Sequence, residues 1–466
     1  MSTTSAQAAI DYAHARRAEL MAGFQELLTI PSISTDPAYK TEVERCADWI
    51  VAEMARIGFQ QCRRIPTAGH PVVYGEWLEA GPDQPTVLIY AHYDVQPVDP
   101  LGLWQSSPFE PTIRDGKIFA RGTLDDKSGV WANLKACEAI LATDGKLPVN
   151  VKLFFEGEEE TGSPHMQSFV EEHQALLAAD ALLICDGPFD PEQPTIPYAL
   201  RGMVAAEVLV RGADHDLHSG VFGGAIHNPI HLVGQMVGSF HDANGRILIP
   251  GFYDRVRKLS ETELAALQEA WTLSRATWTA KAGVKHLWGE TLASQPERLT
   301  ALPTLDVNGI WGGYQGQGIK TVIPAQAGFK VTMRLVADQD PHEIGELFKA
   351  HLFTFACPTL AIEVDIQITD PPLTMAREHP VVEAVQRTFA TTLGKRALLT
   401  RLGGSLPIGG MFQQTLGIPM TSIGLCSGAG GHAPNEYINE EHFYLGIDAA
   451  IHFYYYLAET MAGASA

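Results

Sequence analysis

Two potential metal ligands lie two residues apart at the end of an apolar stretch. The stretch runs from Val87 to Pro97, and His92 and Asp94 appear where its apolar residues stop. Residues two apart share one face of a strand. An imidazole beside a carboxylate is typical of a metal ligand and the acid that orients its ring. The alternative is a strand that runs into solvent through polar residues.

Two adjacent carboxylates precede a predicted helix over residues 130–143. Asp125 and Asp126 would lie at its N-terminus, where the helix dipole favours a capping acid. Capping requires only one acid, so a metal ligand is an equally good interpretation of this pair.

An acidic run and a further aspartate follow two later apolar segments. Four glutamates fall within residues 156–160, after the apolar segment 149–155, and Asp186 follows the segment 179–185. The carboxylates of such a run repel one another unless a cation lies between them or water screens them. A solvated loop is the usual explanation, but the recurrence of acids after successive apolar segments favours a shared cation site.

These side chains require a sheet that brings its strand ends together. Short apolar runs predict buried strands at residues 72–77, 86–91, 149–155 and 179–185, and helical periodicity predicts helices at residues 6–28 and 41–57. Ligands bind at the carboxyl ends of the strands in such α/β sheets. His432, in a glycine-rich loop at residues 426–436, completes a donor set of nitrogen and oxygen atoms without thiolates. That set suits zinc, manganese or cobalt, and two ions if one carboxylate bridges them.

The α/β pattern is interrupted once. An alternating strand follows Arg201, and residues 205–370 have the pattern of a separate α+β domain before the α/β pattern returns. We therefore expect a catalytic domain built from residues 1–204 and 371–466, with an inserted domain at 205–370.

Composition excludes two classes of partner. The 54 acidic and 33 basic residues give a net charge of −21, which disfavours nucleic acids and anionic membranes. There is no apolar run of membrane-spanning length, and the N-terminal residues lack the apolar segment of a signal peptide. Six widely spaced cysteines fit a reduced, cytoplasmic enzyme rather than a disulfide scaffold.

Five ordered segments resemble the signatures of the M20 family of co-catalytic metallopeptidases. They are His92-Tyr-Asp94, Gly122-Thr-Leu-Asp125-Asp126-Lys127, Glu159-Glu160-Thr-Gly162-Ser163, Asp186-Gly187 and Gly431-His432-Ala-Pro-Asn-Glu436. Residues 216–224 and 403–408 are similar to the carnosinase group, so the chain resembles the carnosinase/PepV-like dipeptidase branch. The resemblance runs from about residue 20 onward. It implies a zinc-peptidase-like α/β catalytic domain with an inserted α+β dimerisation (lid) domain.

The resemblance also implies a dinuclear metal site. Asp125 would bridge two divalent cations per chain, with zinc expected first and manganese or cobalt as alternatives. His92 and Asp186 would hold one cation, and Glu160 and His432 the other. A cis peptide bond would follow the bridging aspartate.

Two catalytic residues follow from the same resemblance. Asp94 would orient His92, and Glu159 would be the general base. The two cations lower the pKa of a bridging water, whose proton Glu159 accepts as the water attacks the scissile carbonyl.

Substrate binding is expected in part from the inserted domain. Arg334 and the Gly404–Ser405 loop would hold the substrate's C-terminal carboxylate, although a strand-edge salt bridge explains Arg334 almost equally well. In dimeric relatives the equivalent of His218 reaches the partner's site. Without the resemblance, His218 is interpreted as a surface histidine on a glycine-rich turn.

The expected activity is therefore hydrolysis of dipeptides or short peptides with a free C-terminal carboxylate, by a homodimer formed through residues 205–370. An N-acyl-amino-acid deacylase or desuccinylase on the same scaffold is the alternative. A non-catalytic peptide-binding relative is the third possibility, and the retention of Asp94 and Glu159 argues against it, because binding alone needs no general base.

Overall fold

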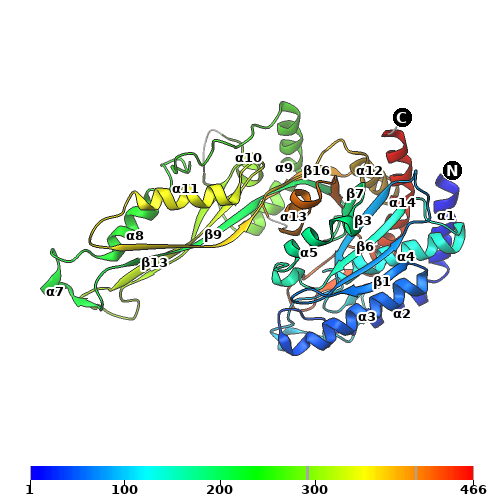
Figure 1. Cartoon of the computed structure of the whole chain (residues 1–466), viewed down its shortest axis with the longest axis horizontal. Coiled ribbons are helices and arrows are strands. Elements are labelled where there is room, and N and C mark those ends of the chain that lie inside the picture. Colours follow the sequence, from blue (N-terminus) through cyan, green and yellow to red (C-terminus); the bar gives the residue numbers. More distant parts are fainter. Residues whose placement is uncertain (1, 290–292, 405–406, 465–466) are drawn as a thin grey trace. The chain divides into compact units, whose positions relative to one another are not determined.

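The chain folds into two compact units (Figure 1). The computed structural model describes residues 2–289, 293–404 and 407–464. Unit 1 comprises Met1–Tyr198, Met375–Leu399 and Met411–Ala466, and unit 2 comprises Ala199–Thr374 and Thr400–Gly410. An α/β unit interrupted by an inserted α+β unit is the fold class expected from the sequence. The unit boundaries differ from the predicted domain boundaries, most clearly because Thr400–Gly410 groups with unit 2.

A six-stranded sheet forms the centre of unit 1. Its strands, in spatial order, are β1 (Gln60–Ile65), β2 (Val72–Trp77), β6 (Asn150–Glu156), β3 (Thr86–His92), β7 (Ala181–Ile184) and β17 (Met420–Ser422). The last four run parallel, and β1 and β2 are antiparallel to their neighbours. Both faces of the parallel strands are buried, which explains why their sequences are apolar throughout rather than alternating.

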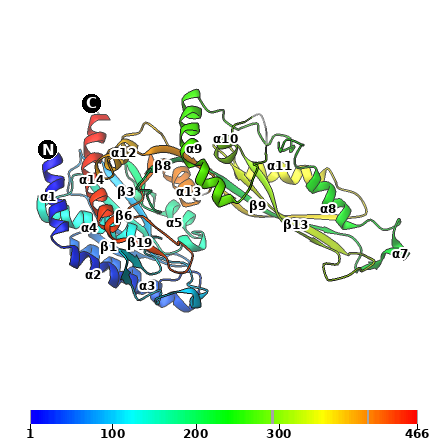
Figure 2. The same ribbon diagram turned by 180° about the vertical axis from the view of Figure 1, so that it is seen from behind.

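Helices cover both faces of this sheet. On one face, Val87 and Ile89 join a core shared with α3, α4, α12 and α14, and Figure 2 shows α1, α4 and α14 gathered together. On the other face, the ring centroids of Tyr90 and Phe154 each lie 5.6 Å from the ring centroid of Phe412 in α13. The helices associated with unit 1 are α1 (Ser2–His14), α2 (Arg17–Leu28), α3 (Lys40–Ile57), α4 (Lys127–Asp144), α5 (Met166–Glu172), α6 (Gln174–Leu177), α12 (Pro380–Thr392), α13 (Pro407–Leu416, which begins in unit 2) and α14 (Glu440–Ala464).

The single helix predicted over residues 6–28 is wrong, because the structure has two helices there. α1 and α2 are separated by Ala15 and Arg16. Helical periodicity continues through the break, and no proline or glycine marks it in the sequence.

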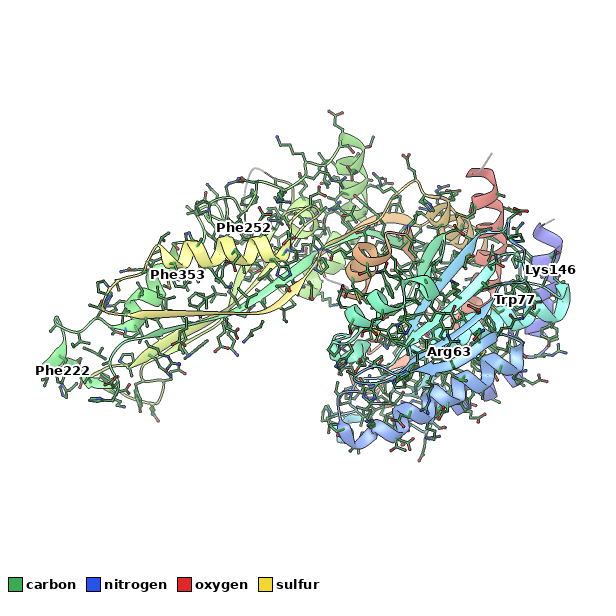
Figure 3. The ribbon with its side chains drawn as sticks, viewed as in Figure 1. Arg63, Trp77, Lys146, Phe222, Phe252 and Phe353 are labelled. Carbon is green, nitrogen blue, oxygen red and sulfur yellow. The ribbon has the colours of Figure 1, made fainter. Side chains whose placement is uncertain are left out.

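Unit 2 is built on a four-stranded antiparallel sheet. Its spatial order is β11 (Thr304–Gly312), β13 (Gln326–Leu335), β9 (Gly202–Arg211) and β14 (Ala361–Asp370). α8 (Pro229–Gly238) and α11 (Pro341–Phe353) supply core residues against one face, so alternate residues of β9, such as Val204 and Val208, are buried. The other helices are α7 (Ser219–Phe222), α9 (Glu261–Ala282) and α10 (Gln295–Thr300). Figure 3 shows Phe222 at the end of this unit farthest from α9.

Smaller elements complete the fold. They are the sheets β18 (Gly428–Ala429)–β19 (Tyr437–Asn439)–β5 (Lys117–Phe119)–β4 (Thr112–Arg114), β15 (Leu373–Thr374)–β8 (Thr195–Leu200)–β16 (Leu398–Leu402) and β10 (Leu217–His218)–β12 (Val322–Ile323), and the 3-10 turns η1 (Pro37–Tyr39), η2 (Leu101–Leu103) and η3 (Glu159–Thr161). All six cysteines lie in the described part of the chain and are free thiols. Among the described helices, none has the length and apolar character needed to cross a bilayer.

Candidate metal centre

Three adjacent parallel strands carry the predicted ligands at their carboxyl ends. β3 ends at His92 and is paired with β6 on one side and β7 on the other. Glu159 and Glu160 begin the turn η3 after β6, and Asp186 follows β7. The parallel register therefore brings these side chains to one edge of the sheet, as their positions in the sequence predicted.

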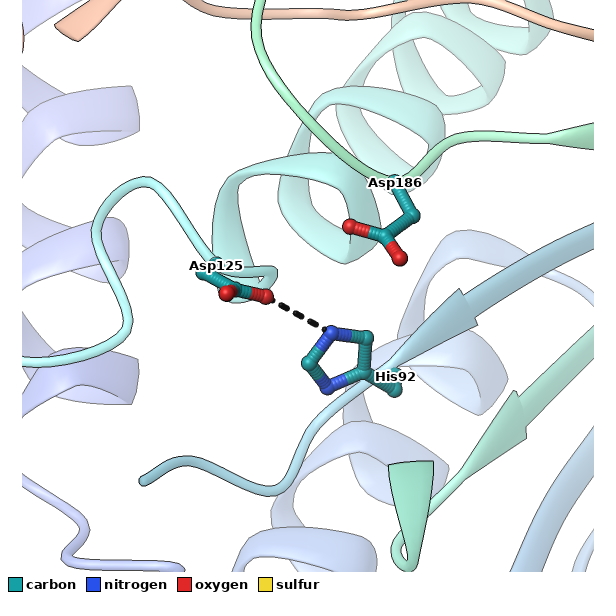
Figure 4. A group of neighbouring side chains, drawn as sticks. All are labelled: His92, Asp125 and Asp186. Atoms are coloured by element: carbon teal, nitrogen blue, oxygen red, sulfur yellow. Dashed lines mark hydrogen bonds and ion pairs between the residues drawn. The ribbon is translucent and has the colours of Figure 1, made fainter. Parts of the chain in front are cut away.

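Asp125 lies between two histidines from distant parts of the chain. Its Oδ1 lies 2.9 Å from Nε2 of His92, and its Oδ2 lies 2.9 Å from Nε2 of His432. Figure 4 shows the contact with His92 and the carboxylate of Asp186 beside it. The peptide bond between Asp125 and Asp126 is cis, as the family resemblance implied.

The candidate ligands form two groups that share Asp125. Ligand atoms of His92, Asp125 and Asp186 lie within 4.8 Å of one another, and so do those of Asp125, Glu160 and His432. Within the second group, Nε2 of His432 lies 3.3 Å from Oε2 of Glu160. All five predicted metal ligands are therefore brought together in two triads that share the carboxylate of Asp125.

The electrostatics of these groups fit a divalent cation. Burial and the negative charge of Asp125 raise the pKa of Glu160 to about 8 and also raise the pKa of Asp186. Burial alone would raise the pKa of Asp125, but hydrogen bonds from the two histidines outweigh it and hold that pKa well below its usual range. Buried carboxylates this close together repel unless positive charge lies among them. Imidazole nitrogens and carboxylate oxygens without thiolates are donors suited to zinc, manganese or cobalt.

Asp94 connects the histidine ligand to the acidic turn. Its Oδ1 lies 3.4 Å from Nδ1 of His92, which is also 3.1 Å from the carbonyl oxygen of Asp94. The same carboxylate accepts hydrogen bonds from the backbone N–H groups of Glu159, at 3.3 Å, and Glu160, at 3.1 Å. The hydroxyl of Ser34 also donates to it, at 2.6 Å. This buried carboxylate is therefore placed both to orient the His92 ring and to fix the turn that carries Glu159.

Glu159 lies in the same electrostatic environment but belongs to neither triad. Burial raises the pKa of its carboxyl to about 7, with the His92 ring opposing the shift and the Asp186 carboxylate adding to it. A carboxyl with that pKa can accept and return a proton near neutral pH.

Glu436 was not identified as a site residue from the sequence, yet it holds the loop that carries Asp125. Its fully buried carboxylate accepts hydrogen bonds from the backbone N–H groups of Gly122, Leu124 and Asp125, at 3.1, 2.7 and 3.2 Å. Nη1 of the buried Arg121 donates to it at 2.6 Å. Gln96, also missed, donates from Nε2 to Oε2 of Glu160 at 2.7 Å. Glu436 ends the last of the five family-like segments and Gln96 lies two residues after the first, but nothing in the sequence indicates their partners.

Comparison with known proteins identifies the family. The model for Peptidase family M20/M25/M40 matches residues 88–455. The chain belongs to this family. The Cys-Gly metallodipeptidase of Schizosaccharomyces pombe is 29% identical, over 93% of this chain and 94% of that protein. The human Beta-Ala-His dipeptidase is 31% identical, over 84% of this chain and 78% of its own.

Solved structures agree with this assignment. An M20 family metallo-carboxypeptidase from Sulfolobus solfataricus matches with a TM-score of 0.80 and 32% identity, covering 95% of this chain and 99% of that one. Human carnosine dipeptidase 1 matches with a TM-score of 0.76 and 28% identity, covering 97% of this chain and 99% of that one. The present M20 peptidase is thus a hydrolase of peptide bonds with dipeptidase relatives, and M20 peptidases are metal-dependent.

The predicted substrate-binding residues of the M20 peptidase belong to unit 2. His218 is exposed, and its Nδ1 accepts a hydrogen bond from the N–H of Gly220 at 3.0 Å. Arg334 lies on β13, and the carbonyl of Gly404 accepts the N–H of Arg201 at 3.0 Å. Ser405 lies outside the described residues. The roles of all four toward the metal centre stay predictions.

Proposed function

We propose that this M20 peptidase hydrolyses the peptide bond of dipeptides or short peptides that carry a free C-terminal carboxylate. The observation that supports this most is the pair of donor triads sharing Asp125, with Glu159 beside them in the turn held by Asp94. The relatives named Cys-Gly and Beta-Ala-His dipeptidases act on different side chains. What their named substrates share is dipeptide length, so we expect length rather than side chain to limit substrates here.

Two divalent cations per chain would bind at the triads, with zinc the first expectation and manganese or cobalt as alternatives. His92, Asp125 and Asp186 would hold one, and Asp125, Glu160 and His432 the other. Bound cations would supply Lewis acidity, which polarises the scissile carbonyl and makes the attacking water more acidic.

Glu159 would act as general base and then as general acid. Its carboxylate would accept the proton of the attacking water and return it to the leaving amine. Asp94 fixes the backbone at Glu159 and Glu160, so the base and a cation ligand are positioned by one buried carboxylate. His92 is held through its second ring nitrogen, which leaves Nε2 directed at Asp125.

Unit 2 would supply the remaining contacts. Arg334, Gly404 and Ser405 would bind the substrate's terminal carboxylate, since an arginine and backbone N–H groups suit that anion. We further propose a homodimer formed through residues 205–370, in which His218 of each chain serves the partner's site and stabilises the oxyanion. The six free cysteines support residence in a reducing compartment, the cytoplasm, which cell fractionation would test.

The test is turnover after chelation and separate readdition of zinc, manganese or cobalt. The substrates are matched dipeptides, tripeptides, dipeptide amides and N-acyl amino acids. Metal-restored cleavage of dipeptides, lost when the C-terminus is amidated, is the expected result. Preference for N-acyl amino acids would assign the enzyme to the deacylases instead. If the restored metal binds but no compound is cleaved, the site is intact and the proposed substrate class is wrong.

A further inference from the structure

Unit 2 contains a cavity whose lining includes none of the candidate metal ligands. It has a volume of about 220 Å³ and lies among α9, α10, the start of β11 and the loop that precedes α9. This volume is below the range of about 300–1,000 Å³ that drug-sized ligands fill. The cavity is therefore suited to a small metabolite.

Aromatic rings form much of the cavity wall. They belong to His241, Tyr253, Trp278 and Trp288, and the rings of His241 and Trp288 meet edge to face at 6.2 Å. Trp288 is nevertheless 72% exposed, which is unusual for so large an apolar side chain. Such walls bind apolar or aromatic groups, and their faces also attract cations.

Two opposite charges lie among these rings. Asp306 is exposed and forms no hydrogen bond or ion pair with any described side chain or backbone group apart from its strand pairing in β11. Arg298 donates from Nη1 to the carbonyl of Trp288 at 2.5 Å, but its buried Nε has no hydrogen-bond partner within the described residues. The cavity thus offers one exposed carboxylate and one buried guanidinium N–H that has no hydrogen-bond partner within the described residues.

The other titratable neighbours do not remove this polarity. Burial lowers the pKa of His241 below its ordinary value, so its ring is neutral near neutral pH and does not repel an ammonium group. Arg201 interacts with the charge of Asp306. Its Nε donates to the carbonyl of Gly403 at 2.9 Å, whereas its buried Nη1 has no hydrogen-bond partner within the described residues.

We propose that this cavity binds a free α-amino acid with a large apolar or aromatic side chain. The ammonium group would pair with Asp306, the carboxylate with Arg298, and the side chain would lie among the aromatic rings. A ligand with only one of these charges would form only one of the two charge-assisted hydrogen bonds, so it would bind less tightly. Binding itself does not require the proposed reaction. If that reaction is correct, the cavity recognises the class of compound that the enzyme releases.

The test is isothermal titration calorimetry on the full-length, metal-loaded protein. The ligands are L-phenylalanine, phenethylamine, which lacks the carboxylate, and 3-phenylpropionate, which lacks the amine. We expect the amino acid to bind at least about tenfold more tightly than either analogue. Asp306→Asn should weaken the binding of L-phenylalanine and phenethylamine by a similar factor and leave the binding of 3-phenylpropionate unchanged. Arg298→Gln should weaken the binding of L-phenylalanine and 3-phenylpropionate and leave the binding of phenethylamine unchanged.

Matched controls are available on the same sheet. Asp365→Asn and Arg211→Gln neutralise exposed charges of β14 and β9 and should leave binding unchanged. The proposal is overturned if L-phenylalanine shows no saturable binding up to about 10 mM, or if both cavity variants bind it as the wild type does, which would place the amino acid elsewhere. The two cavity variants test the site independently, so if one of them fails to fold, the other still decides whether the amino acid binds in this cavity. Dipeptide turnover, measured on the same samples, reports the proposed reaction separately.

Discussion

Asp125 and Asp94 each serve two functional groups at the residue scale. Asp125 contributes to both donor triads, and Asp94 contacts His92 as well as the turn of Glu159 and Glu160. A change at either position would therefore alter several groups together. Informative substitutions are those at residues with one role, and Glu159 is the first of these.

Glu159→Gln should leave the metal content unchanged but lower turnover by about 100- to 10,000-fold, because the amide cannot accept a proton. Metal analysis and steady-state kinetics on one preparation would measure both quantities. Glu172→Gln, an exposed glutamate of α5, is the matched control. Undiminished turnover would remove Glu159 from the mechanism.

Glu436→Gln should weaken metal binding by about 10- to 100-fold, the range found for residues that orient ligands from outside the coordination sphere. The amide cannot neutralise the buried Arg121, and its NH2 group cannot accept the N–H groups of the Asp125 loop. Competition with a chelator of known affinity would measure the change. Unaltered affinity would show that the loop keeps its shape without Glu436; Glu441→Gln is the control.

At the element scale, the parallel strands and the helix α4 between β3 and β6 were predictable, whereas the break between α1 and α2 and the long-range contacts of Glu436 were not. Continuous apolar runs marked β3, β6 and β7, and the polar residues after each run marked the edge at which ligands gather. The break between α1 and α2 escaped prediction because no helix-terminating residue marks it. The role of Glu436 escaped for a different reason: its partners lie more than 300 residues away, and one sequence does not reveal such pairings.

An ion cluster between α3 and α4 gives a prediction about stability. Burial opposes ionisation of Glu53, but hydrogen bonds from Arg56 and Lys135 outweigh it and lower the pKa of its carboxyl below 4.5. The stabilising contribution of the Glu53 carboxylate is therefore complete above about pH 4.5 and is lost as the pH falls through the lower, folded-state pKa.

Glu53→Gln should accordingly lower the free energy of unfolding by about 1–3 kcal/mol near neutral pH. The difference from the wild type should shrink as the pH falls from about 4.5 through the lower folded-state pKa. Urea denaturation at several pH values would measure it, with the exposed Glu19→Gln of α2 as control. A difference that stays constant with pH would contradict the assigned role.

At the scale of the whole molecule, the proposed catalytic and substrate-binding residues are divided between two units. Unit 1 carries the donor triads and the base, whereas the predicted substrate-binding residues lie in unit 2. If two chains associate through unit 2, each site depends on a partner.

Mixing two inactive variants tests this dependence. Glu159→Gln chains and His218→Ala chains should each be nearly inactive, yet random reassociation should restore about a quarter of wild-type turnover, because half of the dimers then hold one complete site. Native mass spectrometry would verify that mixed dimers form. Mixed dimers without recovered turnover would show that His218 does not act across the dimer.

The dependence of the Asp125 loop on Glu436 and His432 also bears on synthesis at the ribosome. Domains begin to fold while the chain is still emerging. Asp125 emerges early, but the carboxylate that holds its loop and the histidine that faces it follow more than 300 residues later. A nascent chain that has exposed all of β3, β6 and β7 therefore still lacks His432, one of the five predicted cation ligands, and the carboxylate of Glu436. If His432 is a cation ligand as proposed, we expect chains that end before it to lack peptidase activity, including incomplete chains released by stalled ribosomes.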